Sequence, residues 1–180
     1  MNQRTALFTA TAMLAAVAAI APSRQAASEH IRNIPPSIHF DHEQTIAQLA
    51  ALAGKPAPVG PEARAVLDLM EPHMLRHEAA VLPALALLPL IAEGKASPDM
   101  KWALLMADRV KAGRQQDLQE QQQITVQLSR LGSAAQQAND ADAFRTAQQI
   151  AADLLRENEV TEPTAILIGE YLRAKLPSGS

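Results

Sequence analysis

Two histidines, His73 and His77, lie four residues apart in the sequence. In a helix this spacing places both imidazoles on one face, about one turn apart. Imidazole is a good ligand for zinc, iron, copper and nickel, so the pair could hold part of a metal ion's ligand set. Many histidine pairs with this spacing are surface or half-buried residues that bind no metal. The pair therefore predicts a metal site only if further ligands converge on it.

An internal repeat supplies candidate ligands for that site. The segment HMLRHEAAVLP, which begins at His73, resembles DLLRENEVTEP, which begins at Asp153; both contain Leu-Arg and end on proline. The alignment places Glu157 opposite His77. A lone Asp153 and Glu157 would more often lie on a solvated helix face. Because the matching positions are polar or ionisable in both halves, we expect them to point inward.

A second, weaker pair of segments extends the repeat to the preceding helices. HEQTIAQLAALA begins at His42 and resembles QQQITVQLSRLG, which begins at Gln121. The chain has five histidines, all before position 78, and glutamine, aspartate and glutamate occupy the equivalent positions of the second half. Facing helices of a bundle can direct such side chains onto one ion in the core. The predicted ligands are His42, His73, His77, Glu157 and Asp153.

Other ionisable residues flank this set. Glu43 and Glu78 each follow a candidate ligand directly, so they are predicted to support the ligands from outside or to be exposed. His39 lies about one turn before His42 and is predicted to be a surface residue that could assist it. His30 falls in a linker and is predicted to take no part.

The elements that must position these residues are predicted to be helices. Alanine and leucine dominate the apolar fraction, aromatic residues make up 3%, and no segment alternates as a half-buried strand would. Apolar spacing and breaking residues predict an all-α fold, an up-down four-helix bundle made of two pseudo-repeated helix pairs. The expected helices cover residues 37–53, 61–94, 97–131 and 139–176. Pro72 is expected to kink the second helix.

The N-terminal segment has the layout of a secretory signal. Arg4 precedes an uncharged apolar stretch, ALFTATAMLAAVAAIA, that is short for a membrane span. We expect residues 1–27 to be a signal peptide or an uncleaved anchor, followed by a linker over 28–36, the bundle over 37–176 and a tail over 177–180. The mature protein is then exported, periplasmic or extracellular, and contacts a membrane only through the N-terminal segment if that segment is retained.

Composition excludes several other functions. The net charge is −3 and no basic patch is interleaved with aromatics, so nucleic acid is not an expected partner. The chain has no cysteine, which excludes disulfides, thiolate ligands and a cysteine nucleophile. It also lacks a glycine-rich phosphate loop and an ordered Ser-His-Asp set, so nothing specifies an enzyme. Metal-assisted catalysis at the histidines is the weakest of the functions considered.

Three segments together resemble the hemerythrin-like, or HHE cation-binding, domain family. They are DHEQTIAQL (41–49), EPHMLRHEAAVLPALALLP (71–89) and ENEVTEPTAILIGEYL (157–172). The resemblance covers roughly residues 37–176. It implies a four-helix bundle around a non-haem di-iron centre that binds dioxygen or senses iron or redox state.

By this resemblance, His42 and His73 match ligand histidines and Glu157 matches the carboxylate of the second half. His77 stands where a bridging glutamate is expected, and Gln121 and Asp153 stand where histidines are expected. Glutamine is a poor ligand for iron, and an imidazole cannot replace a bridging carboxylate. The departures therefore predict one metal ion, iron or another divalent ion such as zinc, with dioxygen as a further partner. The alternative is a metal-free bundle that serves as an interaction or structural protein.

Overall fold

The computed structural model describes residues 36–177, and every regular element in that range is helical. The all-α prediction is therefore confirmed for this part of the chain. The expected signal peptide or anchor, the linker up to residue 35, and residues 178–180 of the expected tail lie outside the described residues.

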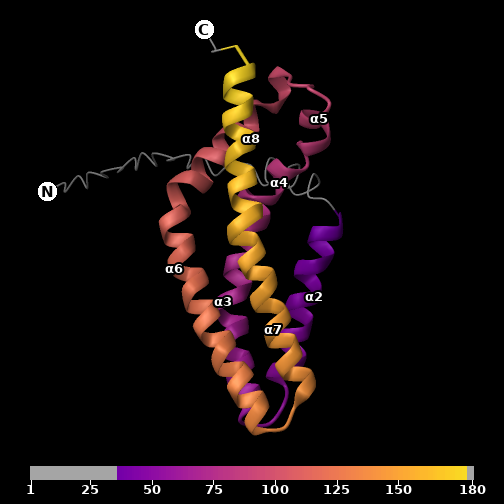
Figure 1. Ribbon diagram of the computed structural model, residues 1–180, viewed down its shortest axis with the longest axis vertical. Coiled ribbons are helices and arrows are strands. Elements are labelled where there is room, and N and C mark those ends of the chain that lie inside the picture. The colour runs from indigo at the N-terminus through magenta and orange to yellow at the C-terminus, as the bar shows by residue number, and fades with distance from the viewer. Residues whose placement is uncertain (1–35, 178–180) are drawn as a thin grey trace, which may run out of the picture.

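Long helices lie side by side along the long axis of the molecule (Figure 1). Helices α7 and α8 follow one another through a π-helical segment, η2, and form one continuous rod (Figure 1). Short elements connect α3 to α6 at one end. The elements are α2 (Pro36–Ala53), α3 (Val59–Ala80), α4 (Leu82–Leu85), α5 (Leu88–Ala92), η1 (Pro98–Lys101), α6 (Trp102–Gln137), α7 (Ala141–Arg156), η2 (Glu157–Thr161) and α8 (Glu162–Lys175).

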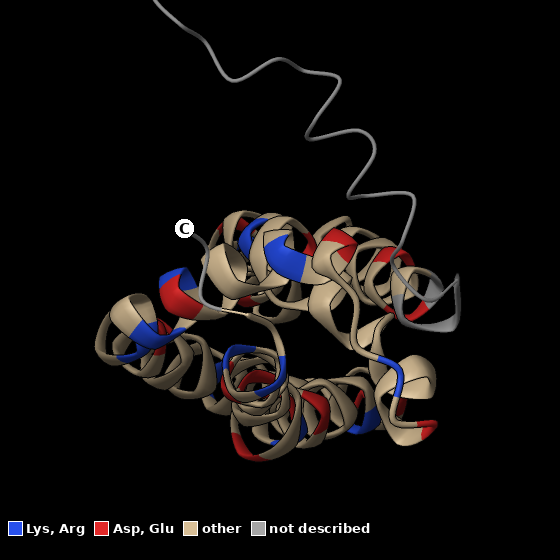
Figure 2. Cartoon of the chain, turned by 90° about the horizontal axis from the view of Figure 1, so that it is seen from above, with Lys and Arg blue, Asp and Glu red and all other residues tan. Residues whose placement is uncertain are grey.

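Each long helix packs against its neighbours: α2 against α3, α3 against α6, and α6 against both α7 and α8. Acidic and basic residues are interspersed over the helices and do not collect on one side (Figure 2). Within residues 36–177 no single helix is long and apolar enough to cross a membrane. Only α3 taken together with the Leu82–Ala92 stretch, across a bend of 43°, reaches such a length and composition.

Several helix boundaries differ from those expected. The second expected helix does not run unbroken to residue 94, because α3 ends at Ala80 and prolines open each of the short helices α4 and α5. Proline suits a first helical turn and removes a backbone hydrogen bond from a preceding helix, which favours these breaks, although α3 itself continues through Pro72. Helix α6 extends past residue 131 because Ala134 and Ala135 are still buried. Asp140 caps α7, accepting a hydrogen bond from the Ala143 backbone N–H at 3.0 Å.

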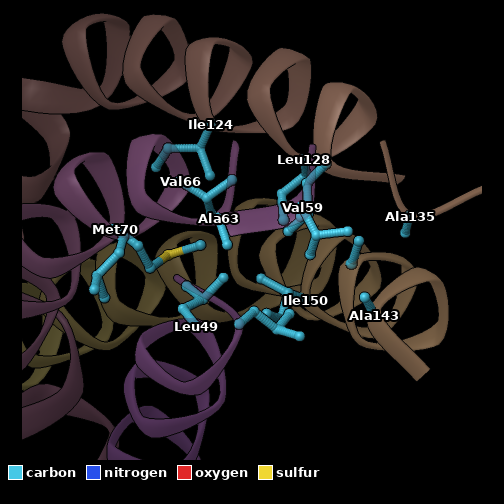
Figure 3. Packing of buried hydrophobic residues seen from close by; sticks show 14 of the residues in the cluster. Leu49, Val59, Ala63, Val66, Met70, Ile124, Leu128, Ala135, Ala143 and Ile150 are labelled. Atoms are coloured by element: carbon cyan, nitrogen blue, oxygen red, sulfur yellow. The ribbon is translucent and has the colours of Figure 1, made fainter. Parts of the chain in front are cut away.

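Two separate apolar clusters form the core. The first joins α2, α3, α6 and α7, whose buried side chains turn toward one another (Figure 3). It includes Leu49, Val66, Met70, Ile124, Leu128 and Ile150. The second joins α4, η1, the start of α6 and α8, with Ile91 of α5 packed against it, and includes Leu82, Val110, Ala165, Ile168 and Leu172.

A band of buried polar residues separates the two clusters. On α3, Met74 belongs to the first cluster and Val81 follows in the second, with His77 between them. On the α7–η2–α8 rod, Leu154 and Ala165 belong to the two clusters, and the residues between them include two glutamates on the inner face. The apolar clusters therefore enclose this polar band from both ends.

Candidate metal centre

Three of the predicted ligands meet in one group. His73 and His77 come from α3, and Glu157 opens η2 on the facing rod; one ligand atom from each lies within 4.8 Å of the others. His73 Nε2 is 3.4 Å and His77 Nδ1 is 3.6 Å from the same oxygen, Glu157 Oε2. Both histidines are almost fully buried, and their rings lie 4.5 Å apart between centroids. The i, i+4 spacing therefore places both imidazoles on one face of α3, as predicted.

His42 approaches Glu157 from the other side. It extends from α2, is buried, and places Nε2 3.3 Å from Glu157 Oε1. Each of the two oxygens of this carboxylate therefore faces at least one imidazole nitrogen. Of the five predicted ligands, the structure brings His42, His73, His77 and Glu157 together.

Glu78 determines which nitrogen of His42 carries a proton. His42 Nδ1 lies 3.2 Å from Glu78 Oε1. A carboxylate only accepts hydrogen bonds, so Nδ1–H is the donor and Nε2 is left with its lone pair in the neutral ring. Nε2 has no hydrogen-bond partner among the described residues. Glu78 thus supports His42 from behind, and His39 Nδ1 lies at the same distance, 3.2 Å, from the same oxygen.

Glu162 fixes His77 in the same way. His77 Nε2 lies 3.2 Å from Glu162 Oε1, so Nε2–H is the donor and Nδ1 keeps its lone pair. This Nδ1 faces Glu157 and has no hydrogen-bond partner in residues 36–177. Carboxylates that accept the outer N–H of a histidine and orient its inner nitrogen are a regular feature of metal sites.

These tautomers leave lone pairs of His42 and His77 directed at a carboxylate, which is repulsive unless a metal cation or an added proton lies between them. Two ligand atoms that are each about 2.1 Å from a tetrahedral ion are about 3.4 Å apart. The separations of His73 Nε2 and His77 Nδ1 from Glu157 Oε2, 3.4 and 3.6 Å, agree with that spacing. The residues present therefore fit a divalent ion bound through nitrogen and oxygen.

The π-helical segment η2 is what turns two glutamates toward α3. The backbone N–H of Glu162 donates to the carbonyl of Glu157, five residues back, as a π-helix requires. In an α-helix these two residues would be about 140° apart around the axis. The wider turn brings both carboxylates to the buried histidines.

Glu162 is a site residue that the sequence reasoning missed. Its counterpart in the repeat is Leu82, also immediately before a proline and fully buried. The signal available in the sequence was that the second half of the repeat has a carboxylate where the first half has this leucine. The α-helical spacing assumed for this segment concealed it, because Glu162 and Glu157 do not share a face of a regular α-helix.

Asp153 is not brought into the group. It lies on α7, where Oδ1 accepts a hydrogen bond from Arg156 at 2.6 Å and both oxygens accept from Gln149. Gln121 is buried on α6, and its side-chain amide donates to Glu162 Oε1 at 2.7 Å. His39 is a partly exposed residue, as predicted, that contacts Glu43 and Glu78.

A cavity of about 510 Å³ lies between α2 and the α7–η2 rod and reaches the group. Its polar lining includes His42, Glu157 and Asp153. Its apolar lining comes from Met70, Met74 and Leu82, among others. The cavity gives a small solute access to the Glu157 carboxylate from the side of α2.

The charges of this group shift two pKa values. Burial alone would raise the pKa of Glu157, but the imidazoles of His42, His73 and His77, when they carry a proton on the nitrogen that faces it, lower it to about 2. Burial would lower the pKa of His42, but Glu157, to which Nε2 donates once it is protonated, and Glu78 outweigh this effect and raise the pKa above 6.5. In the metal-free protein a proton on His42 is therefore the natural counter-charge of Glu157.

These shifts predict how the stability of the metal-free protein depends on pH. The lowered pKa of Glu157 stabilises the fold above 4.5, and this contribution is lost as the pH falls toward 2. The raised pKa of His42 stabilises the fold below 6.5, and this contribution is lost as the pH rises through the raised value. Urea unfolding in chelator should therefore give the highest free energy of unfolding between 4.5 and 6.5. A Glu157→Gln variant should show a weaker decline on both sides; an identical profile would contradict the assignment.

Comparisons of the chain with protein-family models, with curated proteins and with solved structures found no match. The hemerythrin-like resemblance accordingly stays a prediction from three sequence segments.

Proposed function

We propose that this chain is a hemerythrin-like, up-down four-helix bundle that binds one divalent metal ion, iron or zinc. His73, His77 and Glu157 hold the ion, and His42 lies against the other oxygen of Glu157 as the fourth candidate ligand. Three nitrogens and a carboxylate suit either of these metals. Asp153 is left out of the proposed ligand set because Arg156 and Gln149 already engage its oxygens.

One observation carries the proposal. His42 Nε2 and His77 Nδ1 are buried, have no hydrogen-bond partner among the described residues, and both face Glu157. Unpartnered buried nitrogens directed at a carboxylate are costly unless a metal cation or an added proton lies between them. Glu78 and Glu162 hold the outer nitrogens of these two rings, which makes the inner ones ready to coordinate a metal.

The wider role is part of the same proposal. The protein would be exported and would handle a metal ion or, through that ion, dioxygen. The cavity beside His42 and Glu157 supports access for such a small ligand. No step of catalysis is proposed.

Metal content tests the proposal directly. Protein purified without an affinity metal would be stripped with chelator, titrated with iron(II) or zinc, and analysed for bound metal by elemental analysis. We expect about one equivalent per chain, as a single closed ligand set implies. A protein that stays metal-free after exposure to both ions would refute the proposal.

A matched pair of variants tests the ligand set. Glu157→Gln removes the carboxylate that faces the histidines, whereas Asp153→Asn removes the one on the preceding turn of the rod that is paired with Arg156. Loss of a direct ligand should weaken binding at least ~100-fold, since even outer-shell partners cost 10–100-fold. Asp153→Asn should bind as the wild type does. Equal losses of metal affinity in both variants would mean that Asp153 is also a ligand.

The raised pKa of His42 supports one alternative, a metal-free bundle in which a proton on His42 neutralises Glu157. Such a protein would act through its surface, as an interaction or structural protein. It would show no metal-dependent change in stability, whereas metal competes with the proton if the main proposal holds.

A further inference from the structure

A second buried carboxylate adjoins the proposed metal site. Glu162 opens α8, and its side chain is only 1% exposed. An ionised carboxylate at such a depth needs a positive partner and full hydrogen bonding. His77 and Gln121 both contact Oε1, and Arg114 from α6 donates to Oε2.

The helical rod itself positions Arg114. Within the π turn, Glu162 N–H donates to the Glu157 carbonyl, so the Asn158 carbonyl would need the next N–H along, that of residue 163. Residue 163 is proline and has no N–H. Arg114 Nη2 fills the gap and donates to the Asn158 carbonyl at 3.0 Å and to its side-chain oxygen at 2.9 Å.

The two carboxylates beside His77 therefore have different surroundings. Glu157 faces imidazole nitrogens and forms no ion pair with an arginine or lysine of residues 36–177, whereas Glu162 is paired with a guanidinium that does not lose its proton in proteins. One histidine lies between them and presents one ring nitrogen to each. A second metal ion at Glu162 would have to displace Arg114 and bear its repulsion.

We propose that Arg114 is a fixed internal cation that prevents a metal ion from binding to Glu162 and thereby limits the centre to a single ion. The inference rests on the proposed function, because it concerns how many ions that same site accepts. Gln121 also blocks Glu162, because its side-chain amide donates a hydrogen bond to the carboxylate oxygen that would otherwise bind a metal ion. Arg114 is thus a residue that determines metal number without binding metal.

Two double variants that differ only at position 114, where one side chain is neutral and the other is charged, test this inference. Both carry Gln121→His, which adds an imidazole beside Glu162; one also carries Arg114→Gln, and the other Arg114→Lys. Zinc bound per chain would be measured by elemental analysis after titration and gel filtration. We expect about two equivalents for the neutral variant and about one for the lysine variant and the wild type, because a retained ammonium still repels a second ion.

Each outcome distinguishes this inference from the proposed function. If the wild type binds one equivalent and both double variants bind the same number of ions, the charge at position 114 does not set metal number and the inference is wrong. Two equivalents in the wild type would also overturn it while leaving metal binding intact. No zinc in any of the proteins would overturn the proposed function, and the inference with it.

Folding of the variants is followed by circular dichroism in chelator. Glutamine at position 114 still offers an N–H donor to Glu162, so part of the hydrogen bonding survives. If this variant is unfolded without metal, it should refold on addition of about two equivalents of zinc, because metal binding and folding are then coupled. Refolding with one equivalent, or no refolding, would overturn the inference.

Discussion

Replacing both His73 and His77 with alanine is expected to abolish stabilisation of the fold by zinc or iron. The two imidazoles supply nitrogens to the His–Glu group, and without them His42 is the one candidate co-ligand of Glu157 among the described residues. A ligand that binds only the folded state stabilises it by about 4 kcal/mol at a concentration 1,000-fold above its Kd. The free energy of unfolding would be measured in urea, with chelator and with excess metal. The wild type should gain several kcal/mol, and the variant should gain almost none.

The control for this prediction is His39→Ala. His39 is another histidine near the group, but its side chain is 45% exposed and it contacts Glu78 and Glu43 instead of Glu157. This variant should keep most of the metal-dependent gain. If the double alanine variant gained as much from metal as the wild type, His73 and His77 could not be ligands.

Gly169→Ala is expected to destabilise the protein by about 1–3 kcal/mol, the usual cost of overpacking a core. Gly169 is buried on α8, and a Cβ built there would lie 2.2 Å from the Cβ of Ala107 on α6. A real Cβ cannot approach so closely, so α8 would have to move away from α6. Gly169 follows Glu162 by two helical turns on the same face, and the same shift would disturb the carboxylate that orients His77. Thermal or urea unfolding measures the loss.

Two further variants separate steric overlap from helix propensity. Gly132→Ala is the matched control, because its Cβ would meet Phe144 at 3.7 Å, an ordinary contact. It should be neutral or stabilising by up to about 1 kcal/mol, the advantage of alanine over glycine in a helix. Adding Ala107→Gly to Gly169→Ala moves the small residue to the facing helix, and a double-mutant cycle should show favourable coupling. Additive losses would mean that the two positions do not clash.

The sequence alone was sufficient for the all-α fold and for most of the His–Glu group. Helical periodicity is a local property, so apolar spacing indicated the helices, and i, i+4 spacing placed His73 and His77 on one face. The internal repeat also pointed to Glu157, which lies against this pair, and to His42, which lies against Glu157. These predictions needed only regular helices and a facing arrangement.

Only the tertiary structure decided how the group is completed. The π turn at Glu157 changes the phase of the rod, so Glu162 turns inward, a shift that α-helical spacing cannot anticipate. Arg114 reaches Glu162 across 48 positions of sequence, and no local pattern reports such a contact. Asp153 had the expected spacing but is engaged by Arg156 and Gln149 from its own helix. Residue type and helical spacing were therefore enough to identify candidate ligands. Which carboxylates face the histidines was determined by the π turn in the backbone and by ion pairs between residues far apart in the sequence.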